Sequence, residues 1–221
     1  MTAITYSRPT PRSSKRVSKI AGAADTLAGF DHGQEVDALT FGQFSIIDAI
    51  EAVLAKTGPA DVVLATWTAA DFDLAQIEQQ IVSRGILSLR LIIDRSFVAR
   101  KPQFVDLIHE RFGRDSVRST RSHAKFVILT NTEWSVVIRT SMNLNHNPRL
   151  EYLQVVDDPD LAEMYLQVAA GIFAEEEPGL ANRRGVPELA GVIGVEPNVP
   201  VRMGLPPAKG DCPRMGTTPC E

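Results

Sequence analysis

Residues 61–93 read DVVLATWTAADFDLAQIEQQIVSRGILSLRLII and contain two short apolar runs separated by an amphipathic stretch. The runs at 61–67 and 87–93 are rich in Val, Leu and Ile, and their length is typical of buried strands rather than helices. Between them, apolar residues recur at helical spacing over 71–84, and Gly85 ends the stretch. A strand, a helix and a second strand in this order predict two parallel strands joined by a crossover helix.

The sequence before and after this unit continues the alternation. Ser45 is expected to cap a helix over about 45–56, with Asp48 in the capping-box position and Gly58-Pro59 after it. Pro102 is well placed to begin a helix that runs to Phe112. The order helix, strand, helix, strand, helix is typical of an α/β protein.

Further along, apolar strands follow one another without helices between them. A last helix is expected from the Asp158-Pro159 cap to about Phe173. The predicted strands are 117–120, 123–130, its hairpin partner 134–140, and 151–156. The sequence therefore predicts a mixed β-sheet flanked by helices, with polar residues gathered at strand ends, where the active sites of such sheets lie.

The two ends of the chain differ from this middle part. Residues 1–34 are rich in Ser, Thr, Pro, Gly and Arg, which predicts a disordered basic arm before a domain at 35–174. Residues 175–221 hold eight of the chain's fourteen prolines and have no amphipathic period, so we expect a disordered tail. Val192-Ile193 and Val199 to Leu205 could dock on a partner protein.

Composition places the chain among ordinary globular proteins. Hydrophobic residues make up 44% and charged residues 23% of its 221 residues, and no apolar run is long enough to span a membrane. The first twenty residues lack the apolar core of a secretory signal, so we expect a cytoplasmic protein. Cys212 and Cys220 are weak candidates for a metal site or a disulfide, and no metal or cofactor is expected.

Charge is unevenly distributed. The formal net charge is -4, yet the segment from Arg84 to Lys125 holds ten Lys or Arg residues and four acids. Two interpretations remain open: a solvated helix with its loops, or an electropositive channel that attracts a phosphate backbone.

Residues 121–130 read RSHAKFVILT and place a His and a Lys two residues apart at the head of an apolar run. Residues i and i+2 of a strand point to the same face, so His123 and Lys125 are expected to project into one pocket. An imidazole is a nucleophile or general acid near neutral pH, and an adjacent ammonium can neutralise charge that develops on phosphoryl oxygens.

More polar residues follow the next strand. Residues 140–143 read TSMN, and Glu151 lies beyond them. Ser141 and Asn143 can donate hydrogen bonds to phosphoryl oxygens, and Glu151 could orient a His ring, as the acid of a catalytic triad does. Each residue alone also fits an ordinary role in a turn or on a strand edge. The combination, in this order on successive strands, favours a site that attacks phosphodiesters without a metal.

Over roughly residues 43–174 these features resemble the phospholipase D superfamily. Its motif reads H-x-K-x4-D and is followed by G-S-x-N and a later Glu; the resemblance is closest to small single-motif endonucleases. Two positions depart from the pattern, because the motif Asp falls at Thr130 and the Gly at Thr140. The resemblance implies that His, Lys, Ser and Asn line the phosphate and that the Asp has a supporting role.

The resemblance also implies a mechanism and an assembly. His123 would form a phosphohistidine, and a second His123 would protonate the leaving oxygen and then activate water. The chain has a single H-x-K, so we expect a homodimer that acts on nucleic acid, with the second imidazole supplied by the other copy. Further candidate substrate-binding residues are Arg114, Arg118, Arg121, Asn145 and Arg149.

Two alternatives remain. The missing motif Asp would allow a DNA-binding or scaffolding protein that has lost turnover. A lipid phosphodiesterase is less favoured, because the sequence shows no signal and no amphipathic membrane helix.

Overall fold

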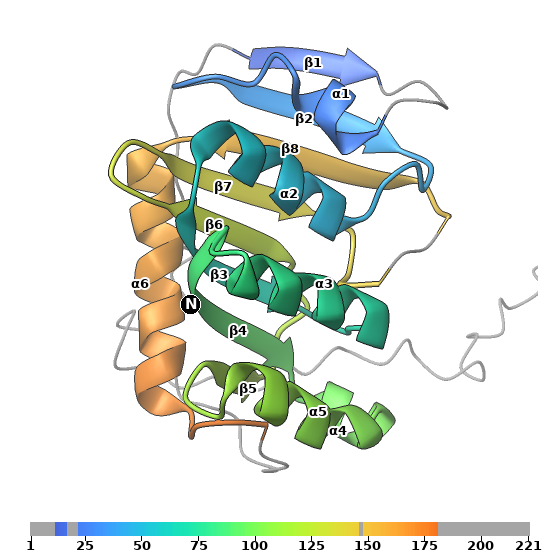
Figure 1. The fold of residues 1–221 in the computed structure, drawn as a ribbon, viewed down its shortest axis with the longest axis vertical. Helices are drawn as coiled ribbons and strands as arrows, with labels where there is room; N and C mark the ends of the chain where they lie inside the picture. Colours follow the sequence, from blue (N-terminus) through green and yellow to red (C-terminus); the bar gives the residue numbers. More distant parts are fainter. Residues whose placement is uncertain (1–11, 17–21, 146–147, 181–221) are drawn as a thin grey trace, which may run out of the picture.

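The computed structural model describes residues 12–16, 22–145 and 148–180, and in this part eight strands form a single sheet (Figure 1). The order across the sheet is β1-β2-β8-β7-β6-β3-β4-β5. The strands are β1 (Arg12–Arg16), β2 (Glu35–Thr40), β3 (Ala60–Thr66), β4 (Ile86–Asp94), β5 (Val117–Thr120), β6 (Phe126–Thr130), β7 (Ser135–Thr140) and β8 (Glu151–Asp157). The helices are α1 (Ala23–Leu27), α2 (Ile46–Thr57), α3 (Asp71–Val82), α4 (Ser96–Arg100), α5 (Gln103–Phe112) and α6 (Pro159–Glu175).

The sheet is mixed, as the sequence predicts. Strands β3, β4 and β5 are parallel to one another, while β3 pairs antiparallel with β6, and β6, β7, β8 and β2 continue antiparallel. The predicted strand–helix–strand unit is therefore β3-α3-β4, and the predicted hairpin is β6-β7. The expected α/β fold, a mixed sheet flanked by helices, is confirmed.

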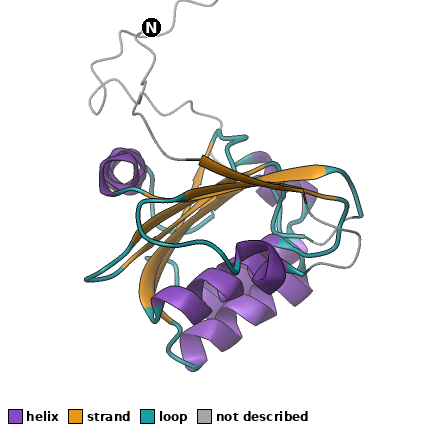
Figure 2. Ribbon diagram, turned by 90° about the horizontal axis from the view of Figure 1, so that it is seen from above, coloured by secondary structure: helices purple, strands orange, loops and turns teal. Residues whose placement is uncertain are grey.

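Helices cover both faces of the sheet (Figure 2). Alternate residues of β3 point to opposite faces, so Val62 and Leu64 join the core under α1, α2, α3 and α5. Val63 and Ala65 join the core under α6. Figure 1 shows α6 running across the strands, from beside β8 to the level of β5.

The helix ends follow the predicted chemistry. Ser45 and Asp48 form the complete capping box at the start of α2, which ends before Gly58. Asp158 caps α6 by accepting from the backbone N–H groups of Asp160 and Leu161. These caps fix where the two helices begin relative to the strands beside them.

Three expectations about the boundaries differ from the structure. The segment 1–34 was expected to be an arm, yet residues 23–27 form helix α1 and Phe30 is 1% exposed. The strand expected from His123 begins at Phe126, so His123 and Lys125 lie in an extended loop before it. The tail was expected from 175, but Leu180 is buried and its N–H donates to Nε2 of His109. Cys212, Cys220 and the two proposed docking segments lie outside the described residues.

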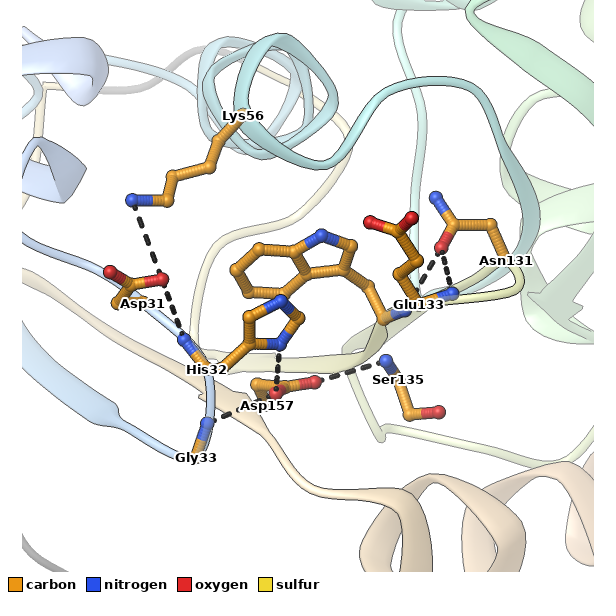
Figure 3. Close-up of polar contacts among 9 residues, drawn as sticks. Asp31, His32, Gly33, Lys56, Asn131, Glu133, Ser135 and Asp157 are labelled. Carbon is orange, nitrogen blue, oxygen red and sulfur yellow. Dashed lines mark hydrogen bonds and ion pairs between the residues drawn. The ribbon is translucent and has the colours of Figure 1, made fainter.

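At one edge, a single carboxylate joins three loops. Asp157, at the end of β8, accepts hydrogen bonds from the backbone N–H of Gly33 and of Ser135, both at 3.0 Å, and contacts Nδ1 of His32 at 3.1 Å (Figure 3). The His32 ring stacks on Trp134, with 3.6 Å between ring centroids. Asp157 therefore ties the start of β2 to the β6-β7 hairpin.

Candidate active site

The polar residues predicted from sequence converge on one edge of the sheet. Because β6 and β8 run antiparallel to β7, the start of β6, the end of β7 and the start of β8 meet at this edge. The end of β3 lies there too, since Ala65 pairs with Phe126. Side chains from four strand ends and the loops beside them can therefore surround one ligand.

His123 and Lys125 are in contact although neither lies within β6. The Nζ atom of Lys125 is 3.4 Å from Nδ1 of His123 and donates to the His123 carbonyl oxygen at 3.0 Å. His123 is exposed and Lys125 is half-buried. The backbone of Lys125 is anchored by the N–H of Thr140, which donates to its carbonyl oxygen. The predicted pairing of an imidazole with an ammonium is thus present in the described geometry.

The surroundings of Lys125 make its ammonium group more acidic than that of an ordinary lysine. Burial lowers the pKa of Lys125 from its ordinary value, and the negative charge of Glu151 acts in the opposite direction. The charge of Glu151 therefore acts on the same ammonium that contacts His123.

Glu151 and Ser141 form a pair across the ends of β7 and β8. The Ser141 hydroxyl donates to Oε2 of Glu151, and its oxygen accepts from the backbone N–H of Tyr152 at 3.0 Å. We expected Glu151 to orient a His ring; within one chain the structure shows it holding Ser141 instead. Ser141 is thereby fixed beside Lys125 at the same edge.

The loop after Ser141 carries two amide side chains with unused acceptors. The Oδ1 atoms of Asn143 and Asn145 are buried and have no hydrogen-bond partner in the described part of the chain. The loop is anchored by Leu144, whose N–H donates to the carbonyl of Thr68 and whose carbonyl accepts from the N–H of Ala70. This loop is therefore attached to the loop that follows β3.

The loop that carries His123 is attached to the end of β4. Asp94, the last residue of β4, accepts from the backbone N–H of Ser122 at 3.1 Å and from the N–H of Ser96 at 2.9 Å. Asp94 is 9% exposed. A buried carboxylate thus fixes the residue next to His123, a role that the sequence did not indicate.

Sequence reasoning also missed two residues beside His123. The indole of Trp67 lies 5.5 Å from the His123 ring, centroid to centroid and tilted by 54°. The guanidinium of Arg100 lies over that indole at 3.8 Å. The position of Trp67, at the end of the apolar run 61–67, is the one signal in the sequence that could have indicated it.

A cleft of about 730 Å³ opens from this edge. Its polar end is formed by His123, Lys125 and Ser141, and its other wall by α6. The apolar lining from α6 consists of Met164, Tyr165 and Val168. The cleft also contains Arg139, whose guanidinium donates to Glu35 at 3.0 Å. An anionic ligand with an apolar or aromatic part matches this lining.

The basic segment does not form one continuous channel. Arg118 is buried, donates to the carbonyl oxygens of Asp115, Val117 and Phe173, and lies over the Phe173 ring at 4.5 Å. These contacts give it a structural role, and the structure does not support the prediction that it binds substrate.

The remaining basic candidates divide between the two ends of the parallel strands. Arg114 precedes β5 and therefore lies at the end away from His123, which also argues against its predicted contact with substrate. Arg121, next to the His123 loop, and Arg149, before β8, are exposed at the site edge. Arg95 and Arg111, in contrast, are paired with carboxylates. Few of the ten basic side chains are thus placed to meet a ligand in the cleft.

The two departures from the family motif lie in different places. Thr130 is at the far end of β6 from His123; five residues along an extended strand correspond to roughly 17 Å. Asn131, next to it, closes the hairpin by accepting from the N–H groups of Glu133 and Trp134. Thr140 is at the site edge, where its hydroxyl donates to the Tyr152 carbonyl at 2.6 Å. The absent Asp therefore lies away from the cleft.

No protein-family model and no curated protein matches this sequence. Among solved structures, the chain is similar to NucT from Helicobacter pylori, with 15% identity, a TM-score of 0.46, and coverage of 65% of this chain and 99% of that one. It is also similar to Nuc from Salmonella typhimurium, a phospholipase D family member, with 15% identity, a TM-score of 0.46, and coverage of 66% and 99%. TrmBL2, an archaeal chromatin protein, has 11% identity, a TM-score of 0.44, and coverage of 65% and 53%.

Among the described residues no helix is long and apolar enough to cross a membrane. In the same residues no three His, Cys, Asp or Glu side chains are grouped as metal ligands would be.

Proposed function

We propose that the protein is a phosphodiesterase that acts on nucleic acid without a metal, with His123 as its nucleophile. The observation that supports the proposal is the contact between His123 and Lys125 in the lining of the cleft, which Ser141 shares, with Asn143 two residues further along the same loop. A nucleophile beside a positive charge and neutral donors suits a phosphorus centre, because charge on the non-bridging oxygens must be stabilised during attack.

The reaction would take place in two displacements. A ring nitrogen of His123 attacks phosphorus, a P–N bond forms, and the bond to the leaving oxygen breaks as a second imidazole donates its proton. That imidazole then takes a proton from water, the resulting hydroxide attacks phosphorus, and the P–N bond breaks. The products are an alcohol and a phosphate monoester, and both imidazoles return to their starting protonation states.

The Lys125 contact bears on which nitrogen attacks. An ammonium cannot accept a hydrogen bond, so at 3.4 Å it faces Nδ1 as a donor and leaves the ring proton on Nε2. Attack by Nε2 requires the proton on Nδ1 instead. We infer that a bound phosphate draws the ammonium away from Nδ1, after which the carboxylate of Glu151, whose charge acts on the same ammonium, accepts from an Nδ1–H group. The carboxylate of Glu151 would then give up its hydrogen bond with Ser141 and accept one from His123, the role that the sequence predicts for it.

A second copy of the chain would supply the second imidazole. In the described part of the chain, His32 contacts Asp157 and His109 contacts Leu180, both away from the cleft. His146 follows Asn145 in the sequence but lies outside the described residues. A two-fold axis near His123 would bring two copies of this residue to opposite sides of one phosphorus.

The test is hydrolysis by the purified protein, with excess EDTA, of bis(4-nitrophenyl) phosphate and of single-stranded and double-stranded DNA. His123→Ala should abolish turnover, and His32→Asn, which removes an imidazole at the other end of the sheet, should not. Acid-quenched reactions should contain a phosphorylated peptide that includes His123. Binding of DNA without cleavage of any substrate would instead favour the scaffolding alternative, and equal hydrolysis by wild type and His123→Ala would exclude His123 as nucleophile.

A further inference from the structure

We propose that Arg100, supported by Trp67, forms a subsite on which an unpaired nucleobase stacks next to the reacting phosphate. The inference rests on the proposed function and names a part of the substrate that His123 and Lys125 do not contact. Two segments that are separate in sequence create it: the loop after β3 carries Trp67, and helix α4 ends at Arg100.

Several contacts hold the guanidinium of Arg100 in place. One nitrogen donates to the Trp67 carbonyl at 2.9 Å, and Nε donates to the hydroxyl of Ser96 at 3.3 Å. Its central carbon lies over the indole at 3.8 Å. The orientation of this exposed side chain is therefore fixed before any ligand binds, which lowers the entropy cost of using it.

The charge of Arg100 is not used within the described structure. Arg95 and Arg111 are each paired with carboxylates, whereas no described Asp or Glu forms an ion pair with Arg100. The guanidinium carbon lies over the indole and the side chain is exposed, so part of the guanidinium stays open to a ligand. Bases of single-stranded nucleic acids stack on such guanidinium planes, and this contact tolerates every base.

The subsite is close to the chemistry. The same indole that supports Arg100 contacts the His123 ring at 5.5 Å, so one ring separates the guanidinium from the nucleophile. A base on Arg100 would thus belong to a nucleotide next to the phosphate under attack. Bases within a duplex are already stacked and paired, so the subsite favours single strands.

The test compares two single-stranded oligonucleotides with the same phosphates, one with normal bases and one abasic around the cleaved bond. Wild type should cleave the base-bearing strand with a kcat/KM roughly tenfold higher, which lies within the range that one stacked base typically contributes. Arg100→Gln should remove this preference, mainly through a higher KM on the base-bearing strand. Arg84→Gln, which removes one charge at the other end of β4, should keep the preference.

Arg100→Lys separates stacking from charge. If the base stacks on the planar guanidinium, the lysine variant should behave like Arg100→Gln on the base-bearing strand. Full rescue by lysine would show that only the positive charge is used and would overturn the stacking proposal. Equal cleavage of both strands by wild type, or an equal loss on both in Arg100→Gln, would also overturn it. If wild type cleaves neither strand nor the small diester, the proposed function itself has failed. Trp67 is left intact because its indole also contacts His123.

Discussion

Asp94 accepts a hydrogen bond from the backbone N–H of Ser122 at 3.1 Å, and so ties the loop that carries His123 to the end of a buried strand. Asp94 also accepts from the N–H and the hydroxyl of Ser96, at the start of the helix that ends with Arg100. One carboxylate therefore positions both the proposed nucleophile and the proposed base-binding residue.

We expect Asp94→Asn to lower kcat by about tenfold to a hundredfold with a smaller change in KM, because a displacement of about 1 Å at a reacting group has an effect of this order. The amide would present a donor to one of the N–H groups that Asp94 now satisfies. Asp61→Asn is the matched control, since Asp61 accepts a hydrogen bond from Ser88 at the opposite end of the neighbouring strand. Equal kinetics for the two variants would mean that Asp94 positions nothing in the site.

The pH dependence of activity should report Lys125. Its lowered pKa implies that the charged form is lost at a lower pH than for an ordinary lysine, so activity should fall on the alkaline side earlier than expected. Glu151 raises this pKa, and Glu151→Gln should therefore move the alkaline limb of kcat/KM to lower pH. Lys125→Arg should move that limb to higher pH, since a guanidinium stays protonated. An alkaline limb that is the same in all three proteins would exclude Lys125 as the titrating group.

The site edge and strands β3 to β8 follow from local pattern, whereas the supporting contacts do not. The capping box at Ser45 is visible in sequence because it depends on neighbours a few residues apart. Strands β1 and β2 were not predicted, and β2 is placed by its pairing with β8, far away in the chain. Asp94, Trp67 and Arg100 were missed because their roles depend on contacts between loops far apart in the chain. Arg118 was misjudged for the same reason: charge counting ignores burial against Phe173.

Introducing the motif's Asp at position 130 should not raise the activity of the site. Thr130 lies at the far end of β6 and pairs with Asp61 on β3. Thr130→Asp would set two carboxylates opposite each other across the strands, which destabilises a sheet by up to about 1 kcal/mol. We expect kcat/KM within about twofold of wild type and a small loss in the free energy of unfolding, measured by chemical denaturation. A tenfold rise in kcat/KM would show instead that the missing Asp limits activity.

Asp157 should matter for stability and not for catalysis. Its carboxylate accepts from Gly33 and Ser135, and hydrogen bonds to a charged group typically contribute about 1.5 to 3 kcal/mol. Asp157→Asn should lower the free energy of unfolding by an amount of that order while kcat changes little, because the residue is at the other end of β8 from Glu151. Asp115→Asn, the same change at an exposed turn, is the control. Unfolding curves that coincide for the two variants would contradict this role.

The composite site makes a quantitative prediction for mixed subunits. If each active site needs one His123 from each of two chains, a heterodimer of wild type and His123→Ala is inactive. After subunit exchange, residual activity should then fall as the square of the wild-type fraction, and the mass in solution should be that of a dimer. Mixing wild type with His32→Asn, which keeps His123, should show no such loss. A linear fall, with exchange demonstrated by mass, would mean that one chain holds both imidazoles, and His146 would then be the first residue to replace.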